Sequence, residues 1–249
     1  MGVLTDLFFW GAAAVIFVAA INKGTFGMGF PLIATPLMAL FIDVPTAVVL
    51  TLIPNVCMDI YQSFSRPWQQ EDVRRLLPLI VPGVVGVLVG TKLLATLPED
   101  TLRLCLGLVI LAFAASQLMP WKIRLPRSNL TLWAAAAGVV SGVIGGVTNV
   151  FTPVTMFFYA AELEKTAFVQ SIGAVFLAFK LTQVAATYHF ELWTATLAML
   201  SVPLAGIALL GYWCGRRIQM RLPETTFRWG VLVVLAIAGL SLVLRGLGG

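Results

Sequence analysis

Long runs of apolar residues are the feature that most constrains what this chain can fold into. Many of them approach the ~20 residues that a helix needs to cross the hydrocarbon core of a bilayer. Of the 249 residues, 59% are hydrophobic and 11% are charged, whereas a typical soluble domain is roughly 25% charged. We therefore predict an all-α polytopic membrane protein. Its net charge of +5 comes from basic residues in short loops, which set orientation in the bilayer and do not serve nucleic-acid binding.

Polar or glycine-rich breaks divide the chain into ten apolar segments. They cover residues 7–21, 30–42, 46–64, 76–97, 102–119, 130–144, 150–161, 166–188, 192–214 and 227–244. Four segments are short and form two pairs, 7–21 with 30–42 and 130–144 with 150–161. Because a glycine-rich break joins each pair, we expect two helical hairpins, which either cross the bilayer fully or dip into it and return.

The second half of the chain repeats the pattern of the first. At a constant offset of 125 residues, Pro78, Gly86 and Gly90 recur as Pro203, Gly211 and Gly215. We expect a single membrane domain over 1–249, with repeat one at about 7–119, repeat two at about 130–246 and a cytoplasmic linker at 120–129. Each repeat then holds a glycine-broken hairpin and three transmembrane helices. This is an odd net number of crossings, so the two repeats are predicted to have inverted topology.

The distribution of basic residues supports that arrangement. Placing the loop 65–75 in the cytoplasm brings eleven basic residues to that side: Arg66, Arg74, Arg75, Lys122, Arg124, Arg127, Lys165, Arg216, Arg217, Arg221 and Arg228. Lys92, Arg103 and Arg245 then lie outside. Because cytoplasmic loops carry the excess of Lys and Arg, both termini are predicted to be periplasmic.

Both hairpin breaks combine glycines with polar side chains at membrane depth, at 22–31 and 141–149. Irregular backbone at this depth is tolerated where it is buried or lines a cavity, and interrupted helices form the substrate sites of many transporters. Close helix packing is the alternative explanation for the glycines. The predicted substrate-binding residues are Asn22, Lys23, Gly24, Thr25, Gly27, Gly29, Gly145, Gly146, Thr148, Asn149, Lys180 and Gln183.

Two ionisable residues lie inside apolar segments, where each costs about 2.5–3.5 kcal/mol on insertion scales. Asp59 and Lys180 stand 121 residues apart at equivalent depth, and Gln62 and Gln183 share that offset. One interpretation is an Asp59–Lys180 pair that neutralises itself. The other makes Lys180 an anion contact, with Lys23 as the other candidate cation, and makes Asp59 with Gln62 a proton-coupling site.

Enzymatic chemistry finds little support in the sequence. The single histidine, His189, lies in a short turn, and Ser141 lacks a Gly-x-Ser-x-Gly setting. Carboxylate or thiolate clusters that would hold a metal are absent from the sequence pattern. We therefore expect neither catalysis nor a cofactor.

The sequence resembles the TauE/SafE sulfite exporter family in three features. These are the break at 22–31 with Pro36 beyond it, the similar segment at 142–153, and the helix ends at 90–98 and 215–223. This family is also called the toluene sulfonate uptake permease family, and the likeness covers about 7–244. The resemblance implies a multi-pass carrier of the bacterial inner membrane for sulfur-containing anions such as sulfite and organosulfonates.

Together these features predict a secondary transporter that works by alternating access at a midplane site between the two breaks, with export as the expected direction. Its expected partners are a small anion, the lipid bilayer and a coupling proton, and the protein is expected as a monomer or homodimer. A passive anion channel and a carrier of another small organic anion are the alternatives.

Overall fold

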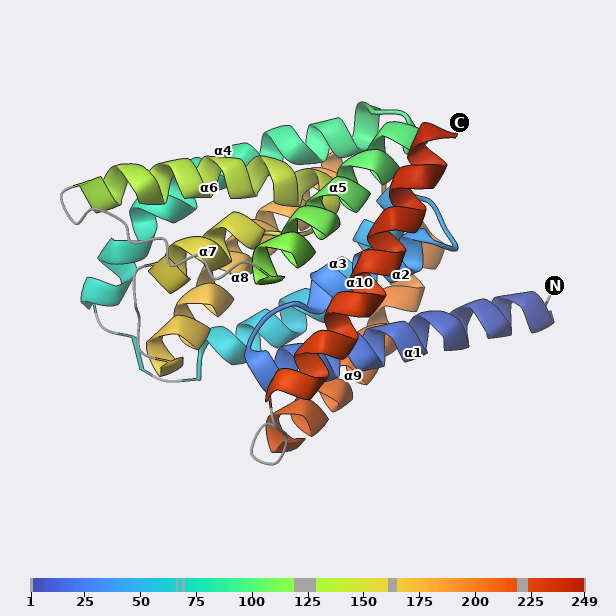
Figure 1. Ribbon diagram of the computed structural model, residues 1–249, viewed down its shortest axis with the longest axis horizontal. Coiled ribbons are helices and arrows are strands. Elements are labelled where there is room, and N and C mark those ends of the chain that lie inside the picture. Colours follow the sequence, from blue (N-terminus) through green and yellow to red (C-terminus); the bar gives the residue numbers. More distant parts are fainter. Residues whose placement is uncertain are drawn as a thin grey trace.

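A computed structural model describes residues 2–65, 67–68, 70–118, 129–160, 165–218 and 224–248. These residues form ten α-helices and no strand (Figure 1). The helices are α1 (Gly2–Phe26), α2 (Phe30–Ala39), α3 (Val44–Ser63), α4 (Gln70–Thr96), α5 (Glu99–Leu118), α6 (Leu130–Thr148), α7 (Thr152–Ala160), α8 (Lys165–His189), α9 (Ala195–Ile218) and α10 (Glu224–Leu247).

Helix length separates the membrane-crossing elements from the short ones. Among the described residues, eight helices are long and apolar enough to cross a membrane, which confirms the polytopic helical prediction. The exceptions, α2 and α7, have 10 and 9 residues. At 1.5 Å per residue they reach about 15 Å, half of a ~30 Å hydrocarbon core. Each hairpin therefore joins one full-length helix to one half-length helix.

The two interruptions are built in the same way. Gly27 and Asn149 follow the first helix of each hairpin with positive φ angles of 78° and 65°, a conformation that ends a helix. The half-helices α2 and α7 then each carry a proline at their second residue, Pro31 and Pro153. A proline in the first turn is well tolerated because its missing N–H would have no partner within the helix.

Helix packing relates the first five helices to the last five. α1 packs against α9 and α6 packs against α4, while α3 packs against α8 and α5 against α10. Matching α1–α5 in order with α6–α10 and exchanging the two sets turns the α1–α9 pair into the α6–α4 pair. The same exchange leaves the α3–α8 and α5–α10 pairs unchanged. Figure 1 shows α4 and α6 running along one edge of the bundle, with α5 and α10 side by side across its front. A two-fold repeat gives this pattern, and the opposite membrane orientation of the halves stays a prediction.

The repeated glycines of the sequence lie in two of these contacts. A Cβ on Gly90 would lie 2.2 Å from the backbone oxygen of Val143 on α6, and one on Gly215 would lie 2.2 Å from that of Ile21 on α1. Small residues allow transmembrane helices to approach this closely. The recurrence of glycine in α4 and α9 therefore reflects the equivalent contacts α4–α6 and α9–α1.

Contacts and Figure 1 place both chain ends at the same end of the bundle. There the Arg245 guanidinium of α10 donates to the Leu40 carbonyl at 2.7 Å. At the opposite end, the Gln170 amide of α8 donates to the Ser63 carbonyl of α3 at 3.2 Å. Arg66, Arg221 and the basic residues of the predicted linker lie outside the described residues, so the predicted membrane orientation stays a prediction.

Candidate functional site

A buried ion pair joins the first interruption to α3. The Lys23 ammonium forms a salt bridge with Asp59 and donates to the Asn55 Oδ1 atom at 2.6 Å. Asn55 and Asp59 stand four residues apart and share one face of α3, and all three side chains are 1% exposed or less. The predicted alternative of an Asp59–Lys180 salt bridge is therefore wrong, because the salt-bridge partner of Asp59 is Lys23, at the end of α1.

Lys180 lies fully buried on α8, beside the second interruption. Its ammonium donates to the Asn149 carbonyl at 3.2 Å and to Gln183 Oε1 at 3.4 Å, and it lies 4.3 Å from the centroid of the Phe151 ring. Among the described residues, no carboxylate lies within salt-bridge distance of it. The described interior thus holds two buried lysines and one buried carboxylate.

Equivalent glutamines donate to carbonyl groups at the two interruptions, among them those of Gly27 and Gly146. The Gln62 Nε2 atom donates to the Gly27 and Val169 carbonyls, each at 2.7 Å. The Gln183 Nε2 atom donates to the carbonyls of Gly145 and Gly146 at 3.2 and 3.1 Å. An unpaired carbonyl at membrane depth costs several kcal/mol, so both glutamines stabilise the broken helices.

Polar side chains of the second interruption reach helices of the first half. The Asn149 amide donates to Thr51 Oγ1 of α3 at 2.8 Å and to Thr35 Oγ1 of α2 at 3.3 Å. Thr148 instead donates to its own helix, to the Ile144 carbonyl at 2.7 Å. The structure therefore brings the two predicted breaks to one central region through Asn149.

Asn22 and Thr25 form further hydrogen bonds at the first interruption. The Asn22 amide donates to the Met28 carbonyl at 3.1 Å, and the Thr25 hydroxyl donates to the carbonyls of Ile21 and Gly215 at 2.9 and 3.2 Å. These contacts fix the turn between α1 and α2 and tie it to α9.

Several glycines predicted to bind substrate lie in close helix contacts. A Cβ on Gly24 would lie 2.1 Å from the Tyr212 carbonyl oxygen, and one on Gly146 would lie 2.7 Å from that of Val87. Gly145 faces the Phe151 ring, whose atoms would lie 2.1 Å from a Cβ. Packing accounts for these three glycines, and a direct role for them in substrate binding stays a prediction.

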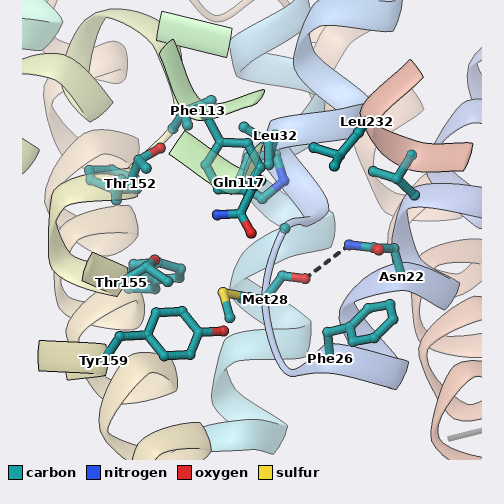
Figure 2. Close-up of a pocket in the computed structure, with 16 residues that line it drawn as sticks. Asn22, Phe26, Met28, Leu32, Phe113, Gln117, Thr152, Thr155, Tyr159 and Leu232 are labelled. Carbon is teal, nitrogen blue, oxygen red and sulfur yellow. Dashed lines mark hydrogen bonds between the residues drawn. The ribbon is translucent and has the colours of Figure 1, made fainter. Parts of the chain in front are cut away.

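A cavity of about 170 Å³ lies between the two interruptions. Asn22, Met28 and Gly29 line it from the first interruption, and Phe151 and Thr155 line it from the second. Figure 2 shows the side chains of Thr152, Thr155 and Tyr159 across from those of Asn22 and Met28, with Gln117 between the two sets. The wall thus offers amide and hydroxyl groups on an otherwise apolar and aromatic surface. Of the predicted substrate residues, Asn22 and Gly29 line this cavity, whereas Lys23 and Lys180 do not.

The sequence analysis missed Thr51, Asn55 and Phe151. Thr51, Asn55 and Asp59 recur every four residues in an apolar segment, which is the signal of a polar stripe along one helix face. That spacing could have identified the two missed α3 residues. Phe151 carries no comparable signal, because an aromatic residue in an apolar segment is ordinary.

Comparison with known proteins identifies the chain's relatives at the family level. The family model described as "Sulfite exporter TauE/SafE" matches residues 12–242. No curated protein and no solved structure matches the chain. The match spans nearly the whole sequence and agrees with eight candidate membrane spans among the described residues. The chain therefore belongs to the TauE/SafE sulfite exporter family, whose members are membrane transporters of sulfur-containing anions.

Proposed function

We propose that this protein is a secondary transporter that moves sulfite or an organosulfonate across the bacterial inner membrane by alternating access, in the direction of export. The observation that carries the proposal is the buried Lys180 side chain beside the second interruption, which has no carboxylate within salt-bridge distance among the described residues. An unpaired charge in a low-dielectric interior is costly. A bound anion at this position would supply the missing negative charge.

Hydrogen-bond donors near the lysines support an oxyanion as the ligand. The Asn55 Nδ2 atom is buried and has no acceptor among the described residues. The oxygens of a sulfite or sulfonate group accept several hydrogen bonds at once, and charge-assisted hydrogen bonds are the stronger kind. The amide and hydroxyl groups of the adjacent cavity would guide such a group toward Lys180.

The Lys23–Asp59 pair is the proposed coupling site. The second carboxylate oxygen of Asp59 has no hydrogen-bond partner among the described residues, and Gln62 follows one turn later on α3. A proton on Asp59 would weaken its salt bridge to Lys23 and so loosen α1 from α3. Protonation would in this way be linked to movement of the first interruption.

The exchangeable packing of the two halves supports alternating access. The contacts α1–α9 and α6–α4 are equivalents, as are α3–α9 and α8–α4. In a second conformation, the first five helices would adopt the arrangement that the last five have here, and the reverse. That conformation would use the same kinds of helix contact. We propose inverted repeats with both termini in the periplasm and a monomer or homodimer as the assembly.

Flux measurements in proteoliposomes test the proposal. We expect saturable uptake of ³⁵S-labelled sulfite or of one organosulfonate by the wild type, and a loss of at least tenfold in Lys180→Ala. Lys92→Ala is the matched control, because Lys92 is exposed on α4. Flux that rises linearly without saturating would instead favour the passive channel, and Lys180→Ala flux equal to that of the wild type would exclude Lys180 from the site.

A further inference from the structure

Phe151 stands between the cavity and Lys180. It is one of the residues that line the cavity, and the Lys180 ammonium lies 4.3 Å from its ring centroid. Both side chains are buried, Phe151 at 2% exposure and Lys180 at 0%. We propose that Phe151 is a gate whose ring closes Lys180 off from the cavity and whose displacement admits the anion. This inference rests on the proposed function for the identity of the ligand, but its geometry is independent of it.

Neighbouring residues hold the ring in the closed position. Its centroid lies 5.3 Å from that of Phe179 and 5.6 Å from that of Phe176, and Phe176 also lines the cavity. On the other side, Gly145 leaves room for the ring, since a Cβ there would lie 2.1 Å from two ring atoms. The ring thus occupies a shaped site beside the end of α6.

The backbone at Phe151 allows such a movement. Residues 149–151 are not helical, so a change in the Phe151 side chain or backbone need not break the hydrogen bonds of α6 or α7. The attraction between an ammonium and an aromatic ring is weaker than a buried, hydrogen-bonded ion pair. An anion that reaches the ring can therefore replace it as the partner of Lys180.

The first interruption has no counterpart of this gate. Pro31 and Pro153 occupy the same position in α2 and α7, so the residue two places earlier is Gly29 in the first half and Phe151 in the second. Gly29 lines the same cavity without a side chain to close it. The gate is thus specific to the half that carries the lysine without a carboxylate partner.

Amine labelling of the purified protein tests the gate without any transport assay. A small reagent pair, formaldehyde with a mild reductant, methylates accessible lysines, and mass spectrometry reports each site. Lys23 is the matched buried control, because it is paired with Asp59 and does not line the cavity, and exposed Lys92 measures reagent activity. In Phe151→Ala we expect labelling of Lys180 to rise at least tenfold while that of Lys23 stays unchanged.

Phe151→Leu fills most of the space of the ring and is expected to keep Lys180 labelling near the wild-type level. Phe151→Val replaces the alanine variant, with the same expected outcome, if the latter does not fold. Lys180 labelling that stays at the wild-type level in the smaller variant would overturn the gate. An equal rise at Lys23 would also overturn it, because that result would show a general loosening.

Adding anions to the labelling reaction separates the gate from the proposed function. In Phe151→Ala, a saturating organosulfonate is expected to reduce Lys180 labelling relative to that of Lys92, because an anion on the ammonium occupies the site. Sulfite is not used in this reaction, because it consumes formaldehyde. If Lys180 becomes reactive but the organosulfonate does not protect it, the gate is supported and an organosulfonate is contradicted as the ligand.

Discussion

Replacing Lys23 by methionine removes one charge of the buried pair while keeping a long side chain in place. The variant leaves Asp59 as a fully buried carboxylate without its salt-bridge partner, and it leaves Asn55 Oδ1 without the donor that lies 2.6 Å away in the wild type. Removing one partner of a buried ion pair costs about 3–5 kcal/mol. An aspartate at the centre of a membrane helix costs about 2.5–3.5 kcal/mol on insertion scales, which agrees in magnitude. We therefore expect Lys23→Met to lower the free energy of unfolding by about 3 kcal/mol or more.

A double-mutant cycle with Asp59 tests whether this loss of stability comes from the Lys23–Asp59 pair. Asp59→Leu alone leaves the Lys23 ammonium buried with only Asn55 beside it, and should cost a similar amount. Replacing both charged residues by apolar ones of similar size is often neutral or stabilising. Lys23→Met combined with Asp59→Leu should therefore recover most of the stability, with a non-additivity of about 2 kcal/mol or more.

Equilibrium unfolding in mixed detergent micelles, followed by circular dichroism, measures these differences. Lys92→Met serves as the control, because it makes the same chemical change at an exposed position. Two single variants whose losses simply add in the double variant would refute the reasoning, since the residues would then act independently. A Lys23→Met loss no larger than that of Lys92→Met would refute it as well.

Three further predictions follow from single contacts. Gly24→Ala should lower the thermal unfolding temperature, because the new Cβ would lie 2.1 Å from a backbone oxygen of α9 and overpacking costs about 1–3 kcal/mol. Gly11→Ala is the control: a Cβ there would have nothing within 4 Å, so the unfolding temperature should stay unchanged or rise. Gln183→Ala removes the donor to two carbonyls at the end of α6 and should cost about 1–3 kcal/mol in unfolding free energy, and a loss no larger than that of Gly11→Ala would contradict this. Ser141→Ala removes the hydroxyl oxygen that accepts from the Val154 N–H of α7 at 2.7 Å; hydrogen exchange should then be faster in α7, and unchanged exchange there would show that other contacts hold the half-helix.

Local sequence signals predicted the elements of this fold well, because each depends on neighbours along the chain. The short paired segments predicted at 30–42 and 150–161 became the half-helices α2 and α7, since glycine or asparagine in the left-handed region and an early proline set their starts. Composition and periodicity are sufficient for such features.

Partners across the bundle were harder to predict, because they depend on how the helices are arranged in three dimensions. The sequence shows two lysines and one aspartate at membrane depth, but helix periodicity does not say which lysine faces Asp59. The glycines were ambiguous for the same reason: Gly29 lines the cavity whereas Gly24 packs against α9. Only the three-dimensional arrangement, in which α1 packs against α9 and reaches α3 through Lys23, distinguishes these roles.

Comparing equivalent positions of the two halves separates scaffold from candidate function. Gln62 and Gln183 are equivalent, and each satisfies carbonyls at its own interruption, so this pair belongs to the shared scaffold. The charged positions differ between the halves. Aligning Pro31 with Pro153 makes Gly145 the counterpart of Lys23, and Lys180 is the counterpart of Asp59.

That difference changes the electrostatics of the second half. In the first half, the lysine at the interruption neutralises the carboxylate of α3. In the second half, the glycine at the same position supplies no charge, and the Phe151 ring fills the space beside it and covers the ammonium of Lys180. A scaffold duplicated only for stability would have no need for a buried cation covered by an aromatic ring. On the basis of this asymmetry we propose that the anion-dependent step lies at Lys180 and that the first half carries the charge pair that a proton disturbs.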